Sequence, residues 1–157
     1  MKNARQLLEE FIAGSFRDPQ QAAAMFAEDG VLEMPYLESL GFAPSYKGRA
    51  EIGDFLKFVR GLYPDMDFQN VKVVMETPGQ ALGEYEFTTV SSKTGRVIHQ
   101  LFMGRLVAEH GSIRLLRESL NLIELSLAIY PDDLAGFAGM NSSSKVTCSM
   151  LPVQRIA

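Results

Sequence analysis

The spacing of hydrophobic residues changes about halfway along the chain. In the first part, apolar side chains recur every three to four residues, which is the period of an amphipathic helix. This spacing predicts helices over residues 4–13, 19–28 and 49–61. Asn3 and the pair Asp18-Pro19 are residue types that commonly begin helices. Between the second and third helices, Val31–Met34 is predicted as a short strand that ends at Pro35.

The second part of the chain has the pattern of strands. Runs rich in β-branched and aromatic residues predict strands over 68–76, 81–90, 97–108 and 113–120. Short turns such as Pro78-Gly79 and His110-Gly111 separate them, so we expect antiparallel hairpins. Glu124–Ile129 is predicted to fold back as a short helical turn. Helices packed on one side of such a curved sheet would enclose a conical space, which gives an α+β fold.

The last predicted strand carries an acid in an apolar row. Glu118 alternates with Leu116 and Leu120 on one face, and both faces of this strand are expected to be covered. A charged carboxylate without a partner would be costly there, so its pKa should rise. A neutral carboxylic acid near pH 7 can act as a general acid or donate a hydrogen bond to a ligand. Alternatively, Glu118 pairs with Arg114 or Arg117, or lies at a solvated strand end.

One predicted strand is apolar on both sides, which bears on assembly. In Val97–Ala108, Phe102 and Leu106 point to one face, while Leu101 and Met103 point to the other. The helices can cover only one of these faces. We therefore expect a homodimer that buries the second face.

Length and composition narrow the classes of function. The 157 residues suit one domain, predicted at 1–138, and 139–157 is interpreted as a tail or an arm laid on a partner subunit. The net charge of −4 and the lack of a Lys/Arg run argue against nucleic acid and membranes as partners. A single cysteine, Cys148, fits a reducing, cytoplasmic location. Two histidines far apart in sequence do not make a metal site with it, and no cofactor is expected.

Further candidate site residues lie outside the last strand. The loop from Tyr36 to Gly48 is rich in aromatic residues, and Tyr36 and Tyr46 suit a lid over a ligand. Glu84 and Glu86 share one face of their strand. The sequence leaves open whether this face turns toward Glu118 or toward solvent.

Four segments carry a resemblance to a known superfamily. They are FAEDG at Phe26–Gly30, KGR at Lys47–Arg49, YPDMDFQNVKV at Tyr63–Val73 and IRLLRESLNLIELSLAI at Ile113–Ile129. In their order and spacing they resemble the SnoaL-like, or nuclear-transport-factor-2-like, superfamily, which includes ketosteroid isomerase and polyketide cyclases. A closer similarity is to the phenazine-biosynthesis A/B proteins.

The resemblance implies a cone-shaped, barrel-like curved antiparallel sheet with three N-terminal helices, of the cystatin-like or ketosteroid-isomerase-like type. It also implies a homodimer and a deep apolar pocket closed by the third helix and the Tyr36–Gly48 loop. The glutamate that acts as an acid in the phenazine proteins matches Glu118. Two family residues are replaced: Phe55 stands for a histidine on the third helix, and Met34 stands for the aspartate base of ketosteroid isomerase.

Three functions follow as hypotheses. The first is a cofactor-independent isomerase, cyclase or dehydratase of secondary metabolism, with Glu118 as general acid on a cyclic apolar or keto-bearing metabolite. The second is a ligand-binding protein that has lost the family's chemistry, and the third is a protein-interaction module. A titratable group within hydrogen-bond reach of Glu118 would favour the enzyme, and an isolated Glu118 would favour binding alone. Ligand contacts are expected from Met34, Tyr36, Tyr46, Phe55, Glu84, Phe102 and Leu116.

Overall fold

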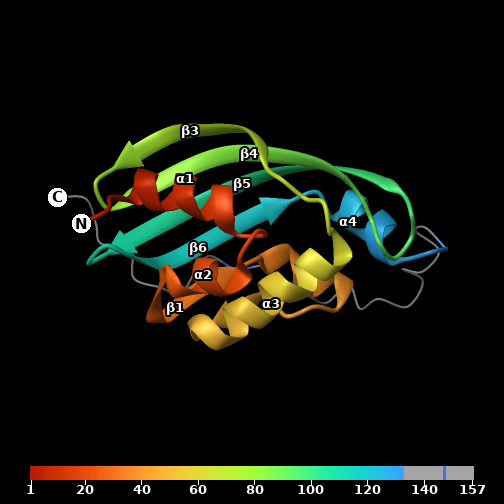
Figure 1. The fold of residues 1–157 in the computed structure, drawn as a ribbon, viewed down its shortest axis with the longest axis horizontal. Coiled ribbons are helices and arrows are strands. Elements are labelled where there is room, and N and C mark those ends of the chain that lie inside the picture. The colour runs from red at the N-terminus through yellow and green to blue at the C-terminus, as the bar shows by residue number, and fades with distance from the viewer. Residues whose placement is uncertain (133–146, 148–157) are drawn as a thin grey trace.

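The computed structural model describes residues 1–132 and 147 and consists of a curved sheet covered by helices (Figure 1). In chain order its elements are α1 (Ala4–Gly14), α2 (Pro19–Ala24), β1 (Phe26–Glu33), the 3-10 helix η1 (Pro35–Leu40), β2 (Ser45–Lys47), α3 (Gly48–Leu62), β3 (Gln69–Thr77), β4 (Gln80–Val90), β5 (Val97–Glu109), β6 (Ser112–Leu120) and α4 (Leu122–Ile129). The strands form one open sheet in the order β2-β1-β6-β5-β4-β3. The predicted α+β fold with three N-terminal helices is therefore confirmed.

The helices lie against one face of the sheet. In Figure 1, α1 crosses β4 and β5, α3 runs beside β1, and α4 sits at the far end near the turn between β4 and β5. No helix within residues 1–132 is long and apolar enough to cross a membrane. The predicted tail or dimer arm, 139–157, lies outside the described residues except for Thr147, whose main-chain oxygen accepts a hydrogen bond from Arg117.

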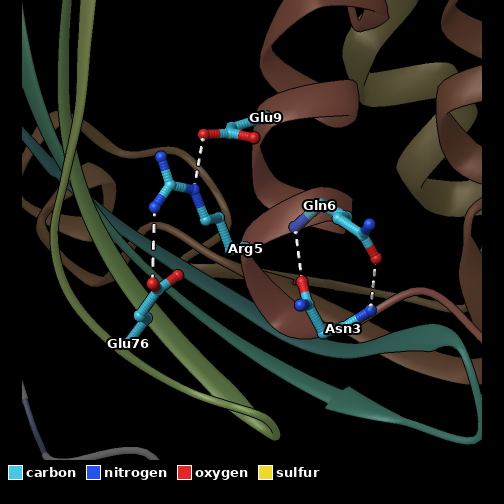
Figure 2. A network of polar contacts seen from close by, with 5 residues as sticks. All are labelled: Asn3, Arg5, Gln6, Glu9 and Glu76. Atoms are coloured by element: carbon cyan, nitrogen blue, oxygen red, sulfur yellow. Dashed lines mark hydrogen bonds and ion pairs between the residues drawn. The ribbon is translucent and has the colours of Figure 1, made fainter.

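The first helix is fixed at its start by side chains (Figure 2). Asn3 Oδ1 accepts a hydrogen bond of 2.9 Å from the main-chain N of Gln6, and Gln6 Oε1 accepts one of 3.0 Å from the main-chain N of Asn3. These two bonds satisfy helix N–H groups that would otherwise lack partners. Arg5 then joins the helix to the sheet, because it binds Glu9 at 2.9 Å and Glu76 on β3 at 3.3 Å.

The second helix is shorter than the sequence predicted. It ends at Ala24, where the pattern predicted a helix over 19–28. Phe26 instead begins β1 and pairs with Ile113 of β6, and the main-chain N of Ile113 donates 2.9 Å to the oxygen of Met25. This β1–β6 pair is parallel, whereas the other neighbouring strands are antiparallel. A partner this distant in sequence overrides the local helical spacing.

The two faces of β4 differ in burial. Tyr85 and Phe87 are buried on the face that the helices cover, while Glu84 and Glu86 are half-exposed on the outer face. The alternative that turned the two acids toward the cavity is therefore wrong. On β5 the same alternation leaves Leu101 58% exposed and Met103 48% exposed on the outer face.

Neither arginine of β6 pairs with the buried acid. The pairing of β6 with β5 skips Arg114, which removes this residue from the row of Glu118. Arg114 binds the carboxylate of Asp29 on β1 and donates 3.0 Å to its main-chain oxygen. Arg117 pairs with Glu33 at 2.7 Å. The two ion pairs that the sequence offered for Glu118 are therefore both made with other carboxylates.

Candidate functional site

A cavity lies between the helices and the inner face of the sheet. Its wall is almost entirely apolar, and aromatic rings line it from α1, α3, β4, β5 and the connecting loops, among them Phe11, Phe16, Phe55, Phe68, Phe87 and Phe102. About 60 Å³ remains for the centre of a water-sized molecule. Among the described residues, the polar side chains that line it are those of Tyr63, Gln100 and Glu118. An apolar cavity with few polar groups is the usual form of a small-molecule site.

Glu118 is held in this wall by a tyrosine. The carboxyl group lies on β6 opposite Gly104, and the residue is 3% exposed. The hydroxyl of Tyr85, which is fully buried on β4, donates a hydrogen bond to Glu118 Oε1. The Tyr85 ring is stacked on Phe102, with centroids 5.6 Å apart, and meets the edge of Phe68 at 4.9 Å. The rings therefore fix the hydroxyl in the direction of Glu118.

A glycine makes this contact possible. Tyr85 and Glu118 lie on strands that are separated by β5, so the tyrosine must reach across it. It does so over Gly104, where a Cβ atom would overlap the Tyr85 hydroxyl and stand 3.0 Å from its Cζ atom. Gly83 lies opposite Gly104 on β4, and a Cβ there would be 3.0 Å from Leu8. Because neither Gly83 nor Gly104 has a side chain, the Tyr85 ring has room to extend across β5.

The surroundings shift the pKa of both groups. Burial raises the pKa of Glu118 from 4.5 to about 7, and the hydrogen bond from Tyr85 partly opposes this rise. Burial, followed by the charge of Glu118 and the hydrogen bond to it, raises the pKa of Tyr85 well above its usual value. Tyr85 therefore remains a hydrogen-bond donor across the physiological range, while Glu118 exists in both protonation states near neutral pH.

Gln100 is bound to the main chain through both atoms of its amide group. Its Nε2 donates 2.8 Å to the oxygen of Asn121, and its Oε1 accepts 3.0 Å from the N of the same residue. These bonds tie β5 to the start of α4. Gln100 is therefore a structural part of the wall.

Three of the predicted ligand contacts line the cavity, and a fourth packs behind one of them. Met34, Phe55 and Phe102 line it together with Glu118. Tyr46 is stacked on Phe55, with ring centroids 4.0 Å apart, and so supports the lining from behind.

Besides Tyr46, three predicted contacts do not line the cavity. Tyr36 is 42% exposed on η1, because the loop that carries it is partly helical and turns its ring outward. Leu116 is fully buried in the core next to the cavity. Glu84 lies on the opposite face of the sheet beside Met103. The prediction that it contacts a ligand in this cavity is therefore wrong.

Sequence reasoning missed Tyr85 and Tyr63. The strand pattern does not single out Tyr85, because it does not tell which side chain of a neighbouring strand reaches Glu118. Glycines at both Gly83 and Gly104, inside two otherwise bulky strands, were the available signal for a close approach. Within the described part of the chain, no cluster of three or more His, Cys, Asp or Glu residues could hold a metal ion.

Solved structures share this fold. A phenazine biosynthesis-related protein from Pseudomonas aeruginosa is 16% identical, with a TM-score of 0.68 over 98% of this chain and 92% of that chain. A ketosteroid isomerase-like fold from Catenulispora acidiphila, solved in complex with trimethylamine, is 12% identical, with a TM-score of 0.67 over 82% and 97% of the two chains. A candidate polyketide cyclase from Pseudomonas putida is 14% identical, with a TM-score of 0.68 over 83% and 100%.

The family is given by the sequence itself. No curated protein matches the chain. Residues 4–116, well over half of the chain, match the SnoaL-like domain. This match covers α1 to α3, β1 to β5 and the first part of β6, and it ends before Glu118 and α4. The resemblance to the SnoaL-like superfamily is therefore confirmed. The chain belongs to the SnoaL-like domain family.

Proposed function

We propose that the cavity binds a small cyclic metabolite and that Glu118 acts on it as a general acid without a cofactor. The pair of Glu118 and Tyr85 in an aromatic wall carries this proposal. A general acid works best when its pKa lies near the working pH, and burial raises the pKa of Glu118 to about 7. The titratable partner within hydrogen-bond reach favours an enzyme over a site with an isolated acid.

The two oxygens of Glu118 have different roles in this proposal. Oε1 accepts the hydrogen bond from Tyr85, which leaves Oε2 for the ligand. Protonated Glu118 donates its proton to a carbonyl or hydroxyl oxygen, and the carboxylate that results keeps the Tyr85 hydrogen bond. The same carboxylate then recovers a proton from the rearranged ligand. The aromatic wall excludes water and so strengthens these polar interactions.

The family and the similar structures support isomerisation or cyclisation as the reaction class, and we keep dehydration as a further reaction of the same acid. Two similar structures are described in terms of phenazine biosynthesis and polyketide cyclisation. We therefore propose a role in secondary metabolism, with the cytoplasmic location that the sequence led us to expect. Phe55 and Met34 add apolar lining where the resemblance implies a histidine and an aspartate, so the substrate differs from those of the related enzymes.

Glu118→Gln is expected to separate binding from turnover. Glutamine keeps the shape and the acceptor for Tyr85 but has no proton to transfer. Native mass spectrometry of the purified protein should reveal a bound cyclic metabolite, which Glu118→Gln retains while its conversion falls by about 100-fold or more. Glu38→Gln, an exposed change on η1, serves as the control. Equal turnover by Glu118→Gln and the native protein would contradict the role of Glu118.

A ligand-binding protein without turnover is the second candidate. Phe55 and Met34 favour it, because both contribute only apolar atoms to the cavity. In that case the native protein would hold a metabolite that it leaves unchanged, and Glu118→Gln would weaken binding or leave it unaltered.

We also propose that the protein is a homodimer formed through the outer face of the sheet. Leu101 and Met103 are exposed there, and Val97 on the same strand is 58% exposed. Covering this face with a second copy would bury about 1,500 Å² or more. Sedimentation at micromolar concentration should show a dimer, and Leu101→Lys with Met103→Lys should give a folded monomer. A native protein that sediments as a monomer would refute the dimer.

A further inference from the structure

The polar groups of the cavity are not equally satisfied. Gln100 donates one hydrogen bond to Asn121 and accepts one from it, and Glu118 accepts a hydrogen bond from the hydroxyl of Tyr85. Tyr63 differs, because its hydroxyl is buried and has no hydrogen-bond partner among the described residues. Buried hydroxyl groups in proteins are nearly always paired. An unpaired one in the wall of a ligand cavity indicates a partner that the ligand supplies.

Tyr63 is held firmly in place. It follows the last turn of α3, where its main-chain N donates 2.9 Å to Val59, and it is only 3% exposed. Its ring packs on Phe87 of β4 at a centroid distance of 5.3 Å. The hydroxyl is therefore fixed in the wall by the helix end and by the ring contact, which is how a preformed binding group is positioned.

The ring of Tyr63 packs against the sheet at a different level from the one at which Glu118 lies. Phe87, on which Tyr63 packs, lies opposite Gln100, whereas Glu118 lies opposite Gly104. Four residues along a strand correspond to about 13 Å. The ring of Phe102 lies between these two levels. A ligand that meets both groups must therefore extend along the aromatic wall.

We propose that the Tyr63 hydroxyl is the second polar contact of the ligand, and that the ligand is an uncharged, flat molecule of about two rings with an oxygen at each end. One oxygen meets Glu118 and the other accepts a hydrogen bond from Tyr63. This inference rests on the proposed function for the cavity, and it defines the class of substrate.

The charge near Tyr63 selects a neutral acceptor. Burial and the nearby carboxylate of Glu124 raise the pKa of Tyr63, so the group stays a neutral hydroxyl and a donor. The same carboxylate disfavours an anionic ligand group at this end. The cavity offers no compensating cation, since the described residues that line it include no Lys, Arg or His. A carbonyl, ether or hydroxyl oxygen fits these conditions.

A pair of probes that differ by one oxygen tests the proposal by titration calorimetry. 2-Naphthol has one polar end, and 2,6-dihydroxynaphthalene has two. We expect the native protein to bind the diol about tenfold more tightly, which corresponds to roughly 1.4 kcal/mol. Tyr63→Phe should remove this advantage and change the affinity for 2-naphthol by less than about twofold. Tyr130→Phe, which removes a hydroxyl bound to Leu40 outside the cavity, should preserve the advantage.

The fold of the variant provides an independent check. Removing a hydroxyl without a partner should leave the thermal midpoint of Tyr63→Phe unchanged or raise it. A clearly lower midpoint would mean that the hydroxyl has a structural partner and would overturn the proposal. So would an equal preference for the diol in Tyr63→Phe and the native protein, or the failure of both probes to bind. None of these measurements involves turnover, so they are distinct from a failure of Glu118 as an acid.

Discussion

Replacing Glu118 with glutamine is expected to stabilise the protein above neutral pH by roughly 3 kcal/mol. Burial raises the pKa of Glu118 from 4.5 in the unfolded chain to about 7 in the folded protein. Below the lower value both states are protonated, and the contribution to stability is fully present. As the pH rises, the unfolded state loses its proton first, so folding stability falls until the folded state also ionises near pH 7.

The difference between the two proteins isolates this one group. Urea unfolding of the native protein and Glu118→Gln should give similar free energies of unfolding at about pH 4 and should diverge up to about pH 8. Glu38→Gln, which replaces an exposed acid, should follow the native curve within about 0.5 kcal/mol. Parallel curves for Glu118→Gln and the native protein would mean that the carboxyl group is solvated. The general-acid role would then lose its physical basis.

Burial of Glu118 could be predicted because it depends on local alternation. The row of Leu116, Glu118 and Leu120 has the two-residue period of a strand, and the neighbouring Leu115 and Leu116 place an apolar residue on each face. The structure agrees: the carboxyl group is buried and faces the cavity. The hydrophobic pattern pointed to burial, but it left open an ion pair with Arg114 or Arg117 and a solvated strand end, and the structure decides between them.

The partner of Glu118 could not be predicted in the same way. Tyr85 reaches it from two strands away, which depends on the register of β4 with β5 and of β5 with β6. Strand alternation left the faces of β4 undetermined, and the choice of Glu84 as a contact followed from that. Arg114 is an extra residue in β6 that has no partner on β5, so the strand is irregular at this point. A regular alternation of faces along the sequence does not reveal such an irregularity.

The predicted boundary between α2 and β1 was wrong for a related reason. Met25 and Phe26 continue the helical spacing of the preceding alanines, so the local pattern favours a helix. The parallel contact with Ile113 decides the matter, and it joins residues far apart in the chain. Elements built from neighbouring residues, such as α1 with its Asn3 cap, were predicted nearly to the residue.

Gly104→Ala is expected to break the pair of Tyr85 and Glu118 and to destabilise the fold by roughly 3 kcal/mol. The new methyl group would occupy the position of the Tyr85 hydroxyl, so the ring must move within a close-packed wall. Overpacking of this kind costs about 1–3 kcal/mol, and loss of a hydrogen bond to a charged group adds about 1.5–3 kcal/mol. Gly61→Ala in α3, where a Cβ meets nothing within 4 Å, should be neutral or stabilising.

A second substitution shows whether the tyrosine is the cause. In Tyr85→Phe the atom nearest to the new methyl is absent, so adding Gly104→Ala should cost clearly less than it does in the native protein. Because the Tyr85 hydrogen bond lowers the pKa of Glu118 in the folded protein, both single variants should extend the pH range over which stability falls to higher values, while the start of the fall stays at the unfolded pKa. If Gly104→Ala lowers the free energy of unfolding equally in the native protein and in Tyr85→Phe, and the pH dependence of stability is unchanged, then Gly104 is needed for packing alone. If Gly104→Ala destabilises Tyr85→Phe less than the native protein, and stability falls over a range that extends to higher pH, then Gly104 is a positioning residue. Its lack of a side chain lets Tyr85 on β4 reach Glu118 on β6.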